Sequence, residues 1–257
     1  MRSVPTSNPL LPWDICQEII DAFWWSNVSN EDRIKFMLAS SLVSKAWRQL
    51  YTLISLRDIH VATPVYGLNM THLGSLYNFQ YDPSLNDKVG ELCRSITFHI
   101  EDDASHACAP EELEDRGMGS CVTVTLYTLN TFPYLLPNLR RVRLEYVNYP
   151  YVDLFHNLRL YHLPPMVEAL DVEYRFDDSL PGEVLAIQRK EQDLRHFAVW
   201  ALGNVKELSI IGGTQAVAKE LLRRTVVLEK LTIDSQVDLQ RLPNGLVDMR
   251  TCHVFQV

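Results

Sequence analysis

Three side chains that could bind a metal, His106, Cys108 and Cys121, lie in the stretch HACAPEELEDRGMGSC. A structural zinc site needs four ligands, and two of them usually form a closely spaced pair such as C-x-x-C. The stretch has no such pair, and its histidine and cysteines do not complete a set of four. We therefore predict no metal site in this chain.

Two other clusters could bind ions. Glu101, Asp102 and Asp103 form an acidic triplet after a candidate strand, but they lack the regular ligand spacing of known cation-binding loops. The sequence GGT, residues 212–214, stands between a candidate strand and a candidate helix, where an anion could bind. It lacks the length, the lysine and the glycine pattern of a phosphate-binding loop. We interpret the triplet as a solvated turn and the glycines as a strand-to-helix connection.

No catalytic signature occurs in the sequence, which contains neither a G-x-S-x-G nucleophile elbow nor a kinase motif. We therefore predict no catalytic residues and no cofactor, and we expect that the protein is not an enzyme. A small hydrolase or transferase is the alternative. It would require a deep pocket with convergent titratable groups, and no such set can be named from the sequence.

The composition restricts the partners. The chain has 257 residues, a formal net charge of −8 and 47% hydrophobic residues, so it can bury a core but lacks the basic balance of a nucleic-acid-binding protein. No signal peptide and no apolar run of about 20 residues is present. The five cysteines are scattered, as is typical of reduced thiols. We expect a cytoplasmic or nuclear protein that binds neither nucleic acid nor membrane.

The elements that must position any site begin with a helical region at residues 8–60. A first helix opens at Pro12 and carries Ile15 and Ile19 on its apolar side. Two more helices follow, one over Ile34–Ala39 behind a cap at Asn30, and one from about Leu42 to Ile54. Three short helices joined by short loops predict a small bundle.

Such a bundle is too small to cover all of its apolar side chains. Leu42, Val43 and Trp47 belong to a broad apolar face of the third helix, and Leu11, Pro12 and Ile15 add apolar surface at the start of the first. Two interpretations remain open with equal weight. The face binds another protein, or it packs against the C-terminal part of the same chain.

After an irregular segment at residues 61–90, one pattern recurs through residues 91–257. An apolar residue is followed by two others, an apolar residue, any residue and an apolar residue, as in LPNLRRVRL, MVEALDV, NVKELSI and VLEKLTI. CRSITFHI fits more loosely, and a last strand is expected around Thr251 to Phe255. Helical patterns cover residues 182–202 and 214–225. We predict an α+β chain in which an α/β solenoid with parallel strands, resembling a short irregular leucine-rich-repeat array, follows the helices.

The N-terminal region resembles an F-box. LPWDICQEII matches the family's L-P-x-E/D-I/L opening, and SLVSKAWRQL matches its L-V-S-x-x-W-R-x-L core. Both halves stand in the expected order within residues 10–55. An F-box followed by irregular leucine-rich-like repeats resembles a large group of fungal proteins.

The resemblance implies a partner and a mechanism. F-boxes bind the Skp adaptor of SCF-type cullin–RING ubiquitin ligases, and the matching positions here are Leu11, Pro12, Ile15, Ile19, Leu42, Val43 and Trp47. The repeat region would hold a target protein and bring its lysines close to the ubiquitin-charged enzyme. The alternative is an F-box scaffold that binds the adaptor but acts outside the ligase.

An aromatic segment that follows the clearest strand motif is a candidate target-binding surface. Tyr149, Tyr151 and Phe155 lie in the sequence YVNYPYVDLFHNLRLYHLPP, and loops at strand ends often carry recognition in repeat proteins. The alternative is that these rings fill gaps between irregular repeats. The identity of the target is not readable from the sequence.

Overall fold

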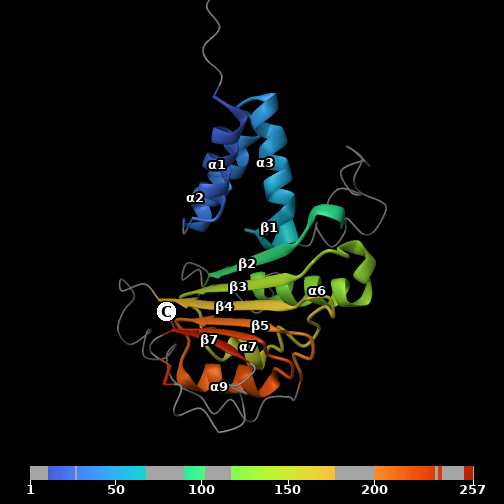
Figure 1. Ribbon diagram of the computed structural model, residues 1–257, viewed down its shortest axis with the longest axis vertical. Coiled ribbons are helices and arrows are strands. Elements are labelled where there is room, and N and C mark those ends of the chain that lie inside the picture. The colour runs from blue at the N-terminus through green and yellow to red at the C-terminus, as the bar shows by residue number, and fades with distance from the viewer. Residues whose placement is uncertain are drawn as a thin grey trace, which may run out of the picture. The chain divides into compact units, whose positions relative to one another are not determined.

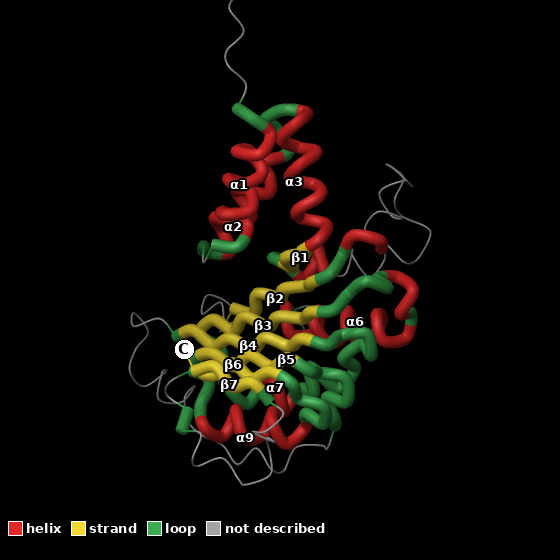
Figure 2. Tube along the Cα trace, in the orientation of Figure 1, coloured by secondary structure: helices red, strands yellow, loops and turns green. Residues whose placement is uncertain are grey.

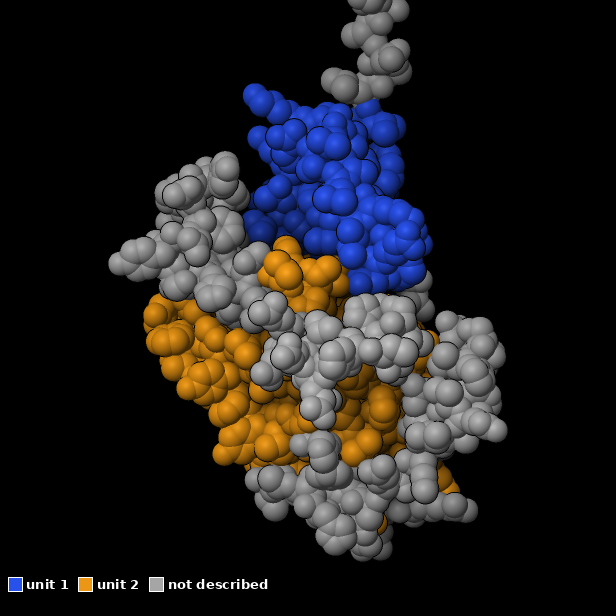
Figure 3. Space-filling model, turned by 180° about the vertical axis from the view of Figure 1, so that it is seen from behind, with its two compact units in different colours: residues 1–57 blue, residues 58–257 orange. Residues whose placement is uncertain are grey.

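The computed structural model describes residues 11–26, 28–67, 90–101, 117–176, 200–234, 237–238 and 252–256. The chain divides into two compact units, Met1–Arg57 and Asp58–Val257 (Figure 3). The expected helical domain ended at residue 60, but Asp58–Val61 is a strand of the second unit's sheet. Most of the expected segment at 61–90 lies outside the described residues.

The described part of the first unit consists of three helices, α1 (Trp13–Trp24), α2 (Asn30–Ser40) and α3 (Lys45–Arg57). Two serines determine where α2 and α3 begin. Ser29 Oγ accepts a hydrogen bond from the backbone N–H of Asp32 at 3.1 Å, and Ser44 Oγ accepts one from the backbone N–H of Trp47 at 3.1 Å. The cap expected at Asn30 is therefore wrong, and α3 begins at Lys45 rather than near Leu42.

The core of this unit is formed mainly by α1 and α3. Ile20 and Trp24 of α1 pack with Leu50 and Ile54 of α3, and none of the four is more than 4% exposed. Each pair is spaced i, i+4, which places both of its side chains on one face of the helix. The core is small, as expected for three short helices.

Arg33 connects α2 to the end of α1. Its guanidinium donates hydrogen bonds to the backbone oxygens of Trp24 at 2.6 Å and Ser26 at 3.0 Å. Carbonyl groups at the C-terminal end of a helix lack partners within that helix, so a buried arginine there both satisfies them and complements the helix dipole. Arg33 is itself buried.

The described residues of the second unit form a seven-stranded sheet in which all neighbours are parallel and the spatial order follows the chain order (Figure 1). The strands are β1 (Asp58–Val61), β2 (Ser95–Glu101), β3 (Arg141–Val147), β4 (Ala169–Arg175), β5 (Glu207–Ile211), β6 (Lys230–Ile233) and β7 (His253–Gln256). The five motif strands and the last strand are confirmed, and β1 was not predicted. The fold is thus mixed helix and strand with a parallel sheet.

The register explains the recurring sequence pattern. The second and third apolar positions of each motif form two rows across the sheet, and each side chain in them is at most 1% exposed. The rows are Ile96–Val142–Leu170–Leu208–Leu231 and Phe98–Leu144–Val172–Ile210–Ile233. Neighbouring strands therefore share one continuous core, as in a solenoid.

The helices of this unit that the structure describes include α6 (Met118–Thr131), α7 (Asp153–His156) and α9 (Gln215–Arg224), with a 3-10 turn, η3 (Pro133–Leu135). Figure 1 shows α6 and α7 behind the strands. The helix expected at 214–225 is confirmed as α9, whereas most of the one expected at 182–202 lies outside the described residues. α6 was not predicted, and it buries Val122, Leu126 and Leu129.

Candidate functional site

Exposed apolar side chains gather at one end of the helical unit. The start of α1 and the turn between α2 and α3 lie at the same end of that unit (Figure 2). Leu42 is 81% exposed, Leu11 59% and Val43 60%. We call this group the apolar end, and its members are Leu11, Pro12, Trp13, Ile15, Leu42 and Val43.

The packing of α1 explains why Ile15 and Ile19 stay outside the core. The sequence placed Ile15, Ile19 and Ile20 on one apolar side, but the helix directs Ile20 and Trp24 into the core. Ile15 and Ile19 are exposed, and their i, i+4 spacing puts them on one line along the helix. The apolar side of α1 therefore contributes both to the core, through Ile20 and Trp24, and to the exposed surface, through Ile15 and Ile19.

Leu42 and Val43 lie in a turn and not on the helix that was expected to carry them. The turn is held at both ends. Ser41 Oγ donates a hydrogen bond to the oxygen of Leu38 at 2.7 Å, the Leu42 N–H donates to the oxygen of Ala39 at 2.9 Å, and Ser44 caps α3. The two exposed side chains are thus presented by an ordered backbone.

Trp47 is partly buried and lies between the core and the exposed surface of the bundle. Its ring is half-buried and packs against the core of Ile20, Trp24, Leu50 and Ile54. A change at Trp47 would therefore disturb the bundle itself, which distinguishes it from the exposed members of the apolar end.

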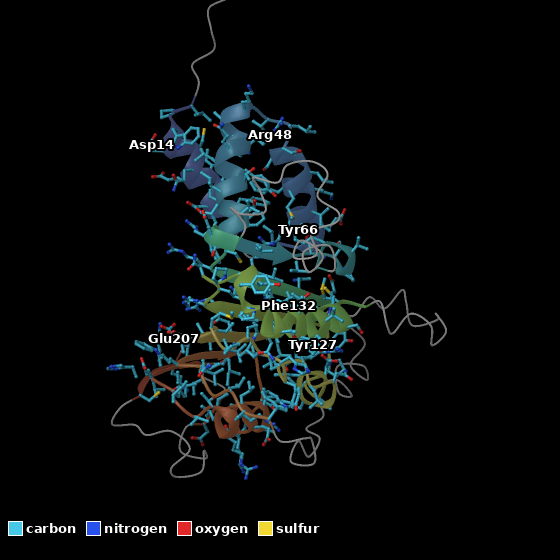
Figure 4. All side chains as sticks on the ribbon, turned by 90° about the vertical axis from the view of Figure 1, so that its right-hand side faces the viewer. Asp14, Arg48, Tyr66, Tyr127, Phe132 and Glu207 are labelled. Carbon is cyan, nitrogen blue, oxygen red and sulfur yellow. The ribbon has the colours of Figure 1, made fainter. Side chains whose placement is uncertain are left out.

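Exposed charged side chains follow the members of the apolar end in the sequence. Asp14 lies on the first turn of α1, and Lys45 and Arg48 lie on the first turn of α3, all of them exposed. Figure 4 labels Asp14 and Arg48. Charges around an apolar patch usually tune the rate and specificity of association more than its affinity.

The candidate target-binding residues are mostly inside the protein. Phe155 is fully buried and Tyr151 is 8% exposed, while Tyr149 is half-buried. The Tyr151 hydroxyl donates a hydrogen bond to the backbone oxygen of Gly212 at 3.0 Å. The ring centroids of Tyr151 and Tyr174 lie 4.7 Å apart. The expectation that Tyr151 and Phe155 are available to a target is therefore wrong, because their rings fill space between the strands and the connections behind them.

The other face of the sheet is polar and its charges are paired with each other. Arg141 contacts Asp171 on β4 at 2.8 Å and reaches Glu207 on β5 at 2.9 Å. Ala169, which lies between Arg141 and Glu207 in the register, is small enough to let the arginine cross β4. Lys230 on β6 lies 3.8 Å from the same Glu207 carboxylate. A row of ion pairs thus spans four strands.

A second group of charges centres on Glu145. Its carboxylate lies 3.3 Å from the imidazole of His99, 3.1 Å from Arg143 and 3.9 Å from Arg175. Burial alone would raise the pKa of Glu145, but the hydrogen bond with His99 and the positive charges of Arg143 and Arg175 outweigh it and lower the pKa to about 2. Glu145 is therefore ionised at neutral pH, and its environment is that of a structural ion pair.

The structure also bears on the candidate metal ligands and on one buried thiol. They contain no group of three or more His, Cys, Asp or Glu side chains arranged to hold a metal ion. His106 and Cys108 lie outside this part of the chain, and Cys121 is buried. Burial raises the pKa of the Cys93 thiol to about 12, which disfavours the reactive thiolate.

Comparisons with known proteins give no family. No family model matches the chain, and no curated protein matches it significantly. Among the helices in the described ranges, none combines the length and apolar character that crossing a bilayer requires.

The sequence did not predict two further sets of exposed apolar side chains. Leu38, near the end of α2, is 67% exposed, and nothing in the short pattern of that helix distinguishes it from a core residue. On the second unit, exposed aromatic side chains lie on and after α6. The signal that could have indicated this second surface is the absence of charged residues from 117 to 139.

Proposed function

We propose that the chain is an F-box subunit of an SCF-type cullin–RING ubiquitin ligase. The first unit docks on the Skp adaptor, and the parallel-sheet unit, a leucine-rich-repeat-like solenoid, recruits a target protein. The F-box resemblance at residues 10–55 supports this proposal. The observation that carries it is the exposure of Leu11, Ile15, Leu42 and Val43 at the apolar end.

The energetics of the apolar end favour a partner. Covering one leucine or valine side chain contributes roughly 1.5–3 kcal/mol when it moves from full exposure to full burial. Leu11, Leu42 and Val43 are each more than half exposed, and together they could supply the centre of an interface. The ordered turn before α3 limits the entropy lost on binding.

The mechanism is tethering and not bond chemistry. One unit binds the ligase through the adaptor while the other holds the target, so the target's lysines have a high effective concentration near the ubiquitin-charged enzyme. No nucleophile or acid–base group in this chain takes part.

The experiment is a binding titration of the full chain against purified Skp adaptor. We compare the wild type with a Leu11→Asp, Val43→Asp double variant, whose changes lie on exposed side chains and should leave the fold intact. Affinity should fall by at least about tenfold, because each carboxylate would be desolvated in an apolar interface. The matched control is Val226→Asp, at a 70% exposed valine of the other unit, which should bind like the wild type.

A wild type that does not bind the adaptor would overturn the proposal, and so would a double variant that is folded by circular dichroism and binds with unchanged affinity. Adding cullin separates the ligase from the scaffold alternative. A ligase subunit should join a complex that contains both adaptor and cullin, whereas a scaffold would keep the adaptor alone.

A further inference from the structure

A second apolar surface lies on the sheet unit, in a part of the chain without charge. Residues 117–139 contain no Asp, Glu, Lys, Arg or His, in a chain that is 22% charged. These residues form α6, η3 and the segment between them and β3. A surface helix normally turns charged side chains toward water, so this stretch is unusual.

α6 has two faces, and only one of them enters the core. Val122, Leu126 and Leu129 are buried, while Val124 is 43% and Tyr127 51% exposed. Two more exposed rings follow α6, with Phe132 44% exposed at the residue after the helix and Tyr134 of η3 70% exposed. Figure 4 shows Tyr127 on the opposite side of the unit from Glu207, which belongs to the polar face of the sheet, and Phe132 between the two.

Ring contacts join these side chains into two groups, one at the end of α6 and in η3, and one between α6 and the segment around Tyr161. The ring centroids of Phe132 and Tyr134 lie 6.0 Å apart. The His162 ring lies 4.9 Å from that of Tyr127 and 4.7 Å from that of Tyr161, both edge to face. Tyr161 is itself 53% exposed. We call this the aromatic surface, and its members are Val124, Tyr127, Phe132, Tyr134 and Tyr161.

The exposed apolar area of the aromatic surface is close to the apolar area of one side of a protein interface. The exposed parts of its four rings together equal about two whole aromatic side chains, or roughly 400 Å². A standard interface buries about 800 Å² on each partner, of which somewhat more than half, roughly 450 Å², is apolar. The aromatic surface therefore supplies nearly the whole apolar share of one standard interface.

The charge distribution indicates which partner fits. In a two-fold symmetric contact each residue near the axis meets its own copy, so a charged residue there would face a like charge. The chain carries a net charge of −8, and two copies repel each other over most of their surface. The uncharged stretch 117–139 avoids that repulsion, and its aromatic rings can pack on the same rings of a second copy.

We propose that the aromatic surface is a self-association interface, through which two copies of this chain form a symmetric dimer. The dimer depends on the sheet unit and not on the apolar end of the helices. Its existence is therefore independent of binding to the Skp adaptor, and either proposal can fail without the other.

The test is sedimentation velocity on the full chain over a range of concentrations up to about 100 μM, at which even a weak interface would be occupied. The wild type should shift from monomer to dimer. A Tyr127→Lys, Tyr134→Lys double variant should raise the dissociation constant at least about tenfold, because the lysines would be desolvated and would repel their copies. The matched control Val226→Lys places the same charge on an exposed residue outside the surface and should dimerise like the wild type.

A mixing experiment separates self-association from binding of another protein. The lysine double variant is mixed with a Tyr127→Glu, Tyr134→Glu double variant, and the opposite charges should restore a mixed dimer. Circular dichroism checks that both variants are folded. A wild type that stays monomeric, a folded lysine variant that still dimerises, or a mixture that does not associate would each overturn the proposal.

Discussion

At the scale of single residues, Gly212 shows how tightly the connections pack against the strands. It follows β5 with a φ of +67°, a conformation that side chains other than glycine rarely adopt. A Cβ added there would lie 2.0 Å from the backbone oxygen of Tyr174. The Gly212 oxygen also accepts the Tyr151 hydroxyl, which ties a buried ring to the turn. The glycines expected to serve a strand-to-helix connection therefore have a structural role.

Gly212→Ala should destabilise the protein by at least about 2 kcal/mol, because the left-handed backbone is strained for alanine and the methyl group meets a backbone atom. Chemical denaturation followed by circular dichroism measures the change. Gly203→Ala is the matched control, since a Cβ at Gly203 meets nothing within 4 Å, and it should alter stability by less than about 0.5 kcal/mol. Equal effects at the two glycines would contradict this account.

At the scale of elements, the sheet has one apolar face and one face of paired charges. Parallel sheets are usually covered on both faces by apolar packing. Here the second face is stabilised by ion pairs that run from strand to strand, with Glu145 near their centre. These pairs are partly buried, so salt screens them less than surface pairs.

Glu145 should make stability fall in acid. Its pKa is about 2 in the folded protein and near 4.5 when unfolded, so its contribution is fully present above pH 4.5 and is lost as the pH falls toward 2. The contribution is on the order of 3 kcal/mol. Urea denaturation at pH 5 and pH 2.5 should show a smaller acid-induced loss in Glu145→Gln than in the wild type. An identical loss in both proteins would show that Glu145 is not the group responsible.

At the scale of the whole molecule, the two units differ in how much core each possesses. The helical unit is centred on four buried apolar side chains. The sheet unit has two rows that run across its motif strands and adds the buried side of α6. A small domain buries a smaller fraction of its surface and is correspondingly less stable on its own.

A chain consisting of residues 58–257 should fold by itself, because its core rows are complete without the helical unit. We expect a mixed helix and strand circular dichroism spectrum and a cooperative thermal transition. The isolated residues 1–57 should unfold at a lower temperature. A truncated sheet unit without a cooperative transition would show that the helices are part of its folding unit.

The strands are the part of the fold that the sequence determined most directly. In each motif the apolar residues recur at the spacing that puts them on one face of a strand, as at Val142 and Leu144. Such a pattern is local and therefore visible in one segment at a time. The parallel order of the strands was also predicted, because a strand followed by a connection and repeated favours a solenoid. For the apolar end, the sequence correctly indicated an excess of apolar residues, though not where Leu42 and Val43 would lie.

Only the tertiary structure decided which apolar side chains are covered. Ile19 and Ile20 are adjacent and chemically identical, yet Ile20 is buried and Ile19 is 43% exposed, because α3 packs against only one side of α1. Tyr151 and Phe155 looked like recognition residues but fill the interior. α6 has weak helix-forming residues and is stabilised by burial against the sheet unit, so local propensity did not reveal it. Burial depends on residues distant in the chain, and for that reason a local sequence pattern does not contain it.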